Sequence, residues 1–240
     1  GQNVNSYRGG CDFAELLREV CAVPGIERVR FTTSHPHDLS DRLIDAFREL
    51  PNLMPHFHLP VQSGSEPVLK RMRRDYTVEW YFDRLEKLRQ ARPDIAVTTD
   101  IIVGFPGETE EDFEKTMQLI ERARYDSLYS FIYSPRPHTS AIRHEDAWGK
   151  VEHEEKIRRL ERLQARAREI SNEYSQVLVG QRVSVLVEGP SKTDPTRRFG
   201  RTPQNRVVNF EGAAPAGSTV QVEILNANPT SLYGREVVAN

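Results

Sequence analysis

The sequence predicts an α/β domain built on a parallel sheet, followed by a small all-β barrel. Between residues 12 and 133, segments with helical spacing of apolar residues alternate with strand-like segments. This order is typical of a parallel sheet covered by helices, because each parallel crossover needs a long connection. From about residue 180 the chain changes to short β segments separated by turns, which is typical of a small barrel.

The predicted helices carry apolar faces or capping signals. In the first, apolar residues recur at i, i+3, i+4 and i+7 from Phe13 to Val20. Ser40 is suited to cap the second helix, and Ser65 opens a short third helix with a proline in its first turn. Thr109 begins a capping sequence whose acidic first turn the helix dipole favours. The longer predicted helices cover residues 13–20, 39–50, 78–91, 109–123 and 152–174.

Strands are predicted at residues 29–33, 57–61, 95–103 and 128–133, and residues 1–7 read as the end of a further strand. A loop rich in polar residues, Gly or Pro follows each of the predicted strands. Because the carboxyl ends of parallel strands meet at one edge of a sheet, these loops are the candidate site. The loops are residues 34–36, 62–65, 104–108 and 134–137.

The predicted barrel is more basic than the rest of the chain. Residues 180–240 hold seven Lys or Arg and five Asp or Glu, a net charge of +2. Because the whole chain has a net charge of −2, residues 1–179 have a net charge of −4. This distribution favours an anionic partner for the barrel. Its β segments are residues 182–187, 206–210, 219–225 and 232–238.

Composition excludes several classes of protein. The 240 residues include 28% charged residues and no apolar run of about 18 residues, so we expect a soluble chain that does not enter a membrane. Two cysteines cannot form a disulfide scaffold and favour a reducing compartment such as the cytoplasm. His35, His56 and His58 do not have the usual spacing of metal ligands, and we interpret them as structural or loop residues.

Several segments, taken together in their order, resemble the radical-SAM methylthiotransferases, most closely the branch that modifies tRNA. Residues 200–210 resemble a TRAM domain, the RNA-binding module of that family. The resemblance covers almost the whole chain. The other segments that carry it are Gly1–Tyr7, Thr33–Pro36, His58–Ser65, Met72–Thr77, Thr99–Thr109 and Tyr133–Pro137.

The resemblance implies an incomplete parallel (β/α) radical-SAM barrel followed by a TRAM barrel. It implies S-adenosyl-L-methionine and two 4Fe–4S clusters in the parent protein, one of them in an upstream domain. The implied reaction transfers a methylthio group to N6-isopentenyladenosine beside the anticodon, so tRNA is the expected partner and no membrane is involved. The electron donor and the sulfur source do not follow from the sequence. The expected domains are a barrel at 1–150, a helical connector at 151–178 and a TRAM domain at 179–240.

The sequence departs from the family in its cysteines. The C-x-x-x-C-x-x-C triad that ligates the cluster is absent, and Cys11 and Cys21 cannot replace three thiolates. We therefore expect a fragment that begins after the triad-bearing loop and is inactive as given, with no catalytic residue or metal ligand to assign. His138 and Ser140 stand where the family has Gly and Pro.

The resemblance assigns cofactor contacts to residues that the loops also single out. For Gln62, Ser63 and Ser65 the alternative is a polar turn that caps a helix. The turn from Gly104 to Gly107 is either a tight connection or a close backbone approach to the adenine of the cofactor. Asp100 is either a satisfied buried carboxylate or an anchor at the site. The expected cofactor-binding residues are Gln2, Asn3, Gln62, Ser63, Ser65, Asp100, Gly104, Phe105 and Pro106.

Substrate contacts are expected from loops and basic side chains. The cluster of Lys70, Arg71, Arg73 and Arg74 is either solvated or holds RNA phosphates. Phe199 and Phe210 belong to the barrel core or stack on bases. The expected substrate- or RNA-binding residues are Asn5, Tyr7, Arg74, Arg136, Arg201 and Asn205. Alternatives are a methylthiotransferase acting on threonylcarbamoyl-adenosine or a ribosomal protein, or a non-catalytic RNA-binding protein.

Overall fold

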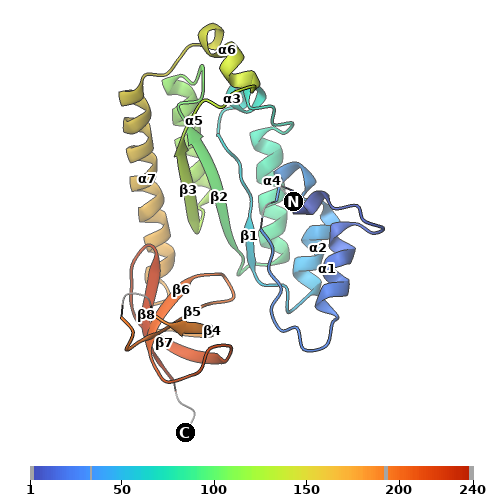
Figure 1. The fold of residues 1–240 in the computed structure, drawn as a ribbon, viewed down its shortest axis with the longest axis vertical. Helices are drawn as coiled ribbons and strands as arrows, with labels where there is room; N and C mark the ends of the chain where they lie inside the picture. Colours follow the sequence, from blue (N-terminus) through green and yellow to red (C-terminus); the bar gives the residue numbers. More distant parts are fainter. Residues whose placement is uncertain (1–2, 33, 192–193, 238–240) are drawn as a thin grey trace. The chain divides into compact units, whose positions relative to one another are not determined.

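A computed structural model describes residues 3–32, 34–191 and 194–237 (Figure 1). The chain divides into two compact units, Gly1–Ala167 and Arg168–Asn240. The sequence predicted boundaries after residues 150 and 178, at the two ends of a long helix, whereas the compact units meet after Ala167.

The first unit is an α/β domain, as predicted. Its three strands pair in parallel in the order β1-β2-β3. Helices separate the strands along the chain (Figure 1). The elements are η1 (Val4–Ser6), α1 (Phe13–Cys21), η2 (Pro36–Asp38), α2 (Asp41–Glu49), β1 (His56–His58), α3 (Glu66–Arg71), α4 (Val78–Ala91), β2 (Ala96–Val103), α5 (Glu110–Ala123), β3 (Ser127–Ile132), α6 (Ser140–Trp148) and α7 (His153–Gln176), whose final turns belong to the second unit.

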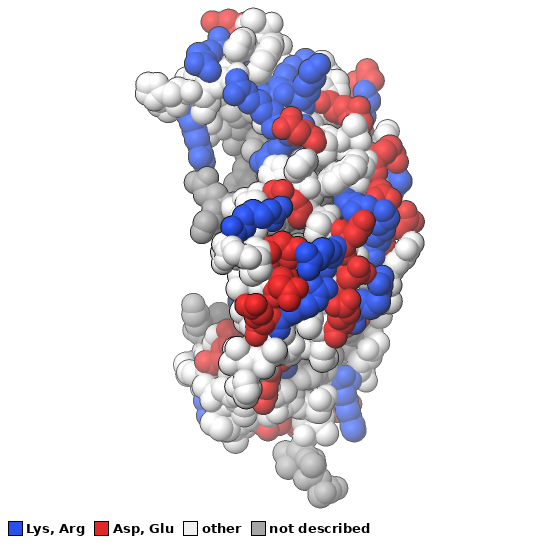
Figure 2. Space-filling model, turned by 90° about the vertical axis from the view of Figure 1, so that its right-hand side faces the viewer, with Lys and Arg blue, Asp and Glu red and all other residues white. Residues whose placement is uncertain are grey.

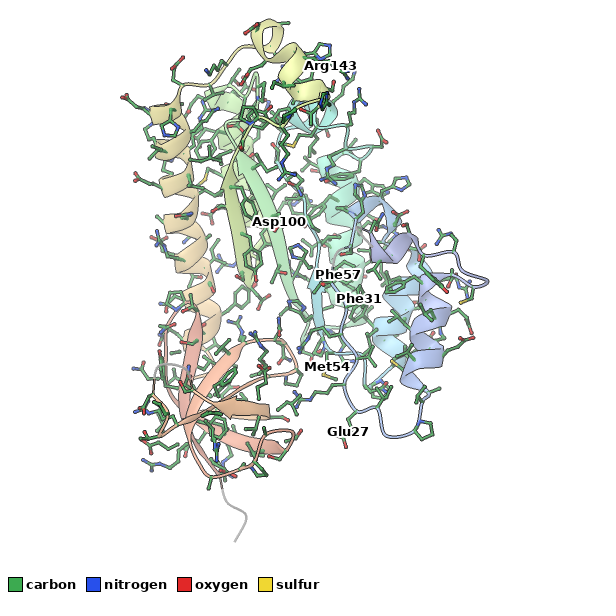
Figure 3. All side chains as sticks on the ribbon, in the orientation of Figure 1. Glu27, Phe31, Met54, Phe57, Asp100 and Arg143 are labelled. Atoms are coloured by element: carbon green, nitrogen blue, oxygen red, sulfur yellow. The ribbon has the colours of Figure 1, made fainter. Side chains whose placement is uncertain are left out.

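One face of the sheet is covered by helices, and alternate strand residues bury there. Side chains of α1, α2, α4 and α5 share one hydrophobic core with the strands. Phe31 packs edge-on against Phe57, with ring centroids 5.4 Å apart (Figure 3). Because successive strand residues face opposite sides, the intervening residues of the same strands are left for the other face. The buried residues include Phe57, Leu59, Val61, Val97, Ile101 and Val103.

Two predicted helix starts are confirmed in atomic detail. The Ser40 hydroxyl accepts a hydrogen bond from the backbone N–H of Leu43, 3.2 Å away. Thr109 and Asp112 form a reciprocal capping box at the start of α5. Local sequence therefore determines where these two helices begin.

Three predictions for the first unit are wrong in the residues described. Residues 29–32 form no strand, and Val29 makes only an isolated parallel bridge with Leu53. In place of a strand end, Val4–Ser6 is a 3-10 helix. The β1 strand ends at His58 rather than at residue 61, because Pro60 has no N–H to donate to the ladder. The helix α6 was not predicted.

The second unit is a closed five-stranded barrel, as predicted, with the order β4-β5-β6-β8-β7. Inward residues such as Val185, Val208 and Phe210 form its core. Phe210 is fully buried, so the idea that it stacks on bases is wrong. The short β5 strand was not predicted; a Cβ on Gly200 would lie 2.1 Å from the carbonyl oxygen of Leu186, so only glycine fits there. The strands are β4 (Arg182–Pro190), β5 (Arg198–Arg201), β6 (Val207–Glu211), β7 (Thr219–Ala227) and β8 (Ser231–Glu236).

Candidate active site

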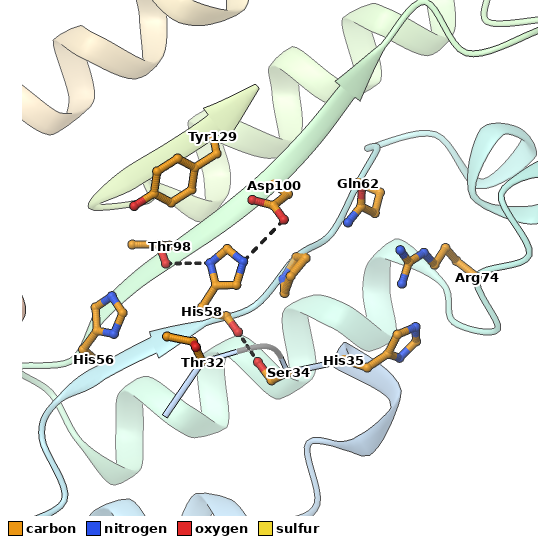
Figure 4. Close-up of a pocket in the computed structure, with 11 residues that line it drawn as sticks. Thr32, Ser34, His35, His56, His58, Gln62, Arg74, Thr98, Asp100 and Tyr129 are labelled. Carbon is orange, nitrogen blue, oxygen red and sulfur yellow. Dashed lines mark hydrogen bonds and ion pairs between the residues drawn. The ribbon is translucent and has the colours of Figure 1, made fainter. Parts of the chain in front are cut away.

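The exposed face of the parallel sheet forms a pocket of about 500 Å³ (Figure 4). Each of the three strands contributes side chains to it. The register places His58 opposite Thr98, and Asp100 opposite Tyr129, so these residues lie on one face. The polar lining residues are Thr32, Ser34, His35, His56, His58, Gln62, Arg74, Thr98, Asp100 and Tyr129.

His58 is held in this pocket by two polar contacts. Its Nδ1 lies 2.9 Å from Oγ1 of Thr98, and its Nε2 lies 3.4 Å from a carboxylate oxygen of Asp100 (Figure 4). The ring also meets Tyr129 edge-on at 6.1 Å. Asp100 is half-buried, contacts His58 through one carboxylate oxygen, and lines the pocket.

The three histidines line one pocket, which the sequence alone did not indicate. The signal was present in the alternation of His56 and His58 with the buried Phe57 and Leu59. His35 reaches the same pocket from a separate loop, which no local pattern predicts. Burial, with a smaller contribution from Arg74, lowers the pKa of His35.

Gln62 occupies a strained position at the centre of the site. Its φ is 72°, a left-handed conformation that non-glycine residues rarely adopt. His58 pairs with Thr98, and Gln62 pairs with Ile101. Between these two pairs the first segment advances by four residues and β2 by three, so the first segment contains one extra residue, as in a β-bulge. Gln62 is buried, and its side-chain amide has no hydrogen-bond partner among the described residues. Such strain is typical of functional sites.

A second pocket of about 750 Å³ adjoins the first and shares Gln62, Arg74 and Asp100 with it. Its wall is apolar and aromatic, and its remaining lining is strongly basic. Arg143 comes from α6, at the end of the sheet where β2 and β3 finish (Figure 3). Among the described residues, Asp100 is the one carboxylate in this lining, so the pocket favours anions. The arginines are Arg71, Arg73, Arg74, Arg136 and Arg143, and the wall includes Ile102, Phe105, Phe131 and Tyr133.

The arginines converge only in three dimensions. In the sequence, Arg71, Arg73 and Arg74 stand out as one cluster, and Arg136 lies in a later loop. Arg143 was missed because α6 was not predicted. By contrast, charges on the face that carries α1, α2 and α4 are interleaved and paired (Figure 2), as in Arg18–Glu49 at 2.8 Å.

The turn after β2 is tightly packed. Gly104 has φ of 70°, and a Cβ there would lie 2.3 Å from Cγ of Lys156. Its N–H donates to the buried carboxylate of Glu108 at 2.9 Å, which also receives Arg159 at 2.8 Å. Phe105 lines the second pocket, whereas Gly104 and Pro106 line neither of the two. The close approach at Gly104 in the structure is thus to Lys156.

Ser63 and Ser65 lie behind the site. Both are fully buried and line neither pocket. The Ser65 hydroxyl donates to Asp112 at 2.5 Å and makes no cap on α3, and Ser63 lies 3.4 Å from the hydroxyl of Thr116. These contacts tie the loop after β1 to α5.

The N-terminal residues lie beside the first pocket. The Asn5 amide accepts from the backbone N–H of His35 and donates to its carbonyl, both at 2.9 Å, so Asn5 supports a lining residue. Asn3 donates to Asp38 at 2.6 Å, and the Tyr7 hydroxyl donates to the Gly9 carbonyl at 3.1 Å. Gln2 lies outside the described residues.

In the second unit the structure brings Arg201 and Asn205 together. Arg201 donates to the backbone carbonyl of Asn205 at 3.3 Å and pairs with Glu188 at 3.2 Å. Asn205 has φ of 70° in the turn between β5 and β6. Both side chains are partly exposed at this turn.

The cysteines do not fit an iron–sulfur cluster. Cys11 precedes α1 and Cys21 ends it, and a 4Fe–4S cluster takes about four thiolates. No group of three or more metal-ligating side chains occurs within residues 3–32, 34–191 and 194–237. None of the helices in this part of the chain is long and apolar enough to cross a membrane.

Comparison with known proteins identifies both units. Residues 10–120 match the Radical SAM superfamily, and residues 176–237 match the TRAM domain. The chain is 65% identical over 237 residues to a protein of Myxococcus xanthus named tRNA-2-methylthio-N(6)-dimethylallyladenosine synthase, covering 99% of this chain and 51% of that protein. Proteins of the same name from Anaeromyxobacter sp. strain K and Paraburkholderia phymatum are 60% and 47% identical, with 98% and 100% of this chain and 52% and 55% of theirs covered.

The chain thus spans about half the length of these curated relatives. A solved structure described as the radical SAM enzyme coproporphyrinogen III oxidase (HemN) from Escherichia coli has a TM-score of 0.49 and 14% identity, covering 86% of this chain and 50% of that chain. A likeness at that level supports no conclusion. The sequence matches do: residues 10–120 belong to the Radical SAM superfamily, residues 176–237 form a TRAM domain, and the chain is similar over nearly its whole length to proteins named as tRNA-2-methylthio-N(6)-dimethylallyladenosine synthases.

Proposed function

We propose that this chain is the cofactor- and tRNA-binding part of a tRNA methylthiotransferase that modifies N6-isopentenyladenosine beside the anticodon. The observation that carries the proposal is the 65% identity extending over 99% of the chain, through both units. A match confined to the Radical SAM region would indicate the cofactor class alone. The matching barrel adds the RNA-binding part of such an enzyme.

S-adenosylmethionine would bind where the two pockets meet. Their volumes, about 500 and 750 Å³, are typical of small-molecule sites. The amide of Gln62 offers both a donor and an acceptor, the carboxylate of Asp100 can accept from hydroxyl or ammonium groups, and Phe105 gives an apolar surface. When bound, this cofactor supplies the radical chemistry, and the protein orients and shields it.

The RNA would follow the basic side chains. The five arginines of the second pocket lie beside the proposed cofactor site, so they suit phosphates that flank a base presented to the cofactor. Arg201 and Asn205 at the barrel turn would add further backbone contacts.

The chain has two cysteines, fewer than the thiolates that a 4Fe–4S cluster usually takes. We propose that the full-length protein supplies the cluster ligands from other segments.

The decisive assay uses the full-length protein, reduced and loaded with cofactor, and tRNA containing N6-dimethylallyladenosine. Nucleoside mass spectrometry after digestion should detect the 2-methylthio derivative. Tight binding of tRNA and cofactor without any product would contradict the enzyme and favour the non-catalytic RNA-binding alternative.

A first prediction tests the cofactor site. Gln62→Ala in the full-length protein should weaken S-adenosylmethionine binding roughly three- to tenfold, since one hydrogen-bonding group is lost. Affinity for tRNA should hold, because Gln62 is buried and carries no charge to pair with a phosphate. Calorimetric titration with the cofactor and a tRNA binding assay check both. Unchanged cofactor affinity with a collapse of tRNA binding would reject the assignment.

A further inference from the structure

Lys156 on α7 is a buried lysine to which the described residues give no acidic partner. The residue is 7% exposed. Its methylene stem lies against Gly104, and its ammonium lies 5.5 Å from the centroid of the Tyr133 ring. In the part of the chain that the structure describes, no ion pair or hydrogen bond involves this ammonium. The stem is the buried part of this side chain, because Nζ is not among the fully buried, unpartnered nitrogens of the described residues and so remains accessible.

The neighbouring cations of the same helix differ from Lys156 in this respect. Arg159 is 5% exposed and pairs with Glu108 and Glu155, each at 2.8 Å. Arg162 pairs with Glu114 at 2.7 Å. Arg159 is therefore paired in the way that is usual for a buried charge, and the exposed Arg162 also has an acidic partner. Lys156 differs from them, because no acid among the described residues pairs with its ammonium.

Tyr133 presents a second unsatisfied donor beside it. Its hydroxyl is buried and has no hydrogen-bond partner among the described residues, although native buried hydroxyls are nearly always paired. Tyr133 lines the second pocket, and its ring meets Phe105 at 5.0 Å. Burial, with a smaller contribution from Glu145, raises the pKa of this phenol, so the hydroxyl stays protonated and can donate.

We propose that Lys156 and Tyr133 bind one phosphodiester group of the RNA substrate beside the second pocket, which Tyr133 lines and next to which Lys156 contacts the Tyr133 ring. The proposal rests on the proposed function, and it adds two residues to the RNA site. An ammonium and a hydroxyl together match the several acceptor oxygens of a phosphate. The five arginines that line the same pocket indicate that the RNA backbone passes there.

The test measures binding of the full-length protein to an anticodon stem–loop RNA carrying N6-dimethylallyladenosine. Lys156→Met keeps the stem that packs on Gly104 and removes the charge. We expect about ten- to a hundredfold weaker binding, because a hydrogen bond to a charged group is removed. The slope of log affinity against log salt should fall by somewhat less than one, the value for one phosphate contact.

The stability of the folded protein should not fall with RNA affinity in these variants. Because the described residues give Lys156 no partner in the folded protein, Lys156→Met should leave the melting temperature unchanged or raise it. Tyr133→Phe removes the hydroxyl alone and should also preserve stability while weakening RNA binding. If both residues hold the same phosphate, the double variant should bind RNA more tightly than the product of the two single effects predicts.

Lys115→Met is the matched control, because Lys115 is an exposed lysine of α5 paired with Glu111. It should change RNA affinity less than about twofold. The inference fails if Lys156→Met and Tyr133→Phe leave RNA affinity and salt slope at the values of the unmodified protein. It also fails if they weaken S-adenosylmethionine binding and spare the RNA. If the unmodified protein does not bind the RNA, the proposed function itself is refuted.

Discussion

At the scale of single residues, the site depends on side chains that the described part of the fold leaves unsatisfied. Gln62 holds a left-handed backbone conformation, and its amide has no partner among the described residues. Within the same residues, the buried Tyr133 hydroxyl has no hydrogen-bond partner, and the Lys156 ammonium has no acidic partner. Unsatisfied buried groups and a positive φ both cost free energy. These costs are consistent with groups reserved for ligands.

Gln62→Gly should separate strain from binding. Glycine adopts a φ of 72° without steric cost, so this variant should be about 1 kcal/mol more stable than Gln62→Ala. Both variants lack the amide and should bind S-adenosylmethionine equally weakly. Urea denaturation measures the stability of the two variants, and calorimetric titration measures their affinity for S-adenosylmethionine. A glycine variant less stable than the alanine variant would show that the backbone at this position is not strained.

At the scale of elements, α5 is the support of the site. Its capping box is joined by the buried hydroxyl of Ser65, so Asp112 ties the start of α5 to the loop after β1. Burial opposes ionisation of Asp112, but hydrogen bonds from Ser65 and Thr109 outweigh it and lower the pKa of this carboxyl. The loop that contains Gln62 is therefore positioned by a helix terminus.

Asp112→Asn should destabilise the protein by about 1–2 kcal/mol at pH 7, because it weakens a helix cap and a buried hydrogen bond. A carboxyl with a lowered folded pKa contributes stability above its unfolded pKa, near 3.9, and loses it as pH falls through the folded value. The difference in free energy of unfolding between the variant and the unmodified protein should thus become smaller below about pH 4. Urea denaturation across pH tests this. Asp45→Asn, an exposed carboxylate paired with Arg48, is the control, and an equal loss there would contradict the role of Asp112.

At the scale of the whole molecule, the chain combines an acidic α/β unit with a basic barrel. The barrel includes the end of α7: the Ser171 hydroxyl donates to the carbonyl of Pro229 at 2.7 Å, and the Gln176 amide donates to that of Ala227 at 3.0 Å. A deletion that tests the barrel should therefore begin at Arg168. Starting it at residue 180 would leave behind helical turns that belong to the barrel.

Removing residues 168–240 from the full-length protein should weaken tRNA binding and flatten its salt dependence, by roughly 0.7–0.9 in log slope for each phosphate that the barrel neutralises. Filter binding over a range of salt concentrations measures both. Equal affinity and slope with and without the barrel would refute its role in RNA binding, provided that cofactor binding by the truncated protein shows that the first unit is folded.

The 240-residue chain by itself should not develop the brown absorbance of an iron–sulfur cluster after anaerobic reconstitution. Two cysteines, Cys11 before α1 and Cys21 at its last residue, are too few to supply the thiolates. Visible absorption and iron analysis check this. A stable four-iron cluster that disappears in Cys11→Ser or Cys21→Ser would overturn the expectation.

The sequence by itself determined the features that depend on neighbouring residues. The caps at Ser40 and Thr109, the parallel α/β order and the β barrel follow from spacing and turn chemistry, and the motifs indicated the family. Segment 29–32 was misjudged because a strand needs a partner in register, and strand propensity alone does not supply one.

Only the tertiary structure decided which distant residues meet. His58 reaches Asp100 because two parallel strands pair in one register, and Arg143 joins Arg74 because α6 folds over the end of the sheet. That Gly104 faces Lys156, and that no described acid pairs with Lys156, depends on how α7 packs against the turn after β2. Local sequence does not encode these contacts, because they form between segments that packing alone brings together.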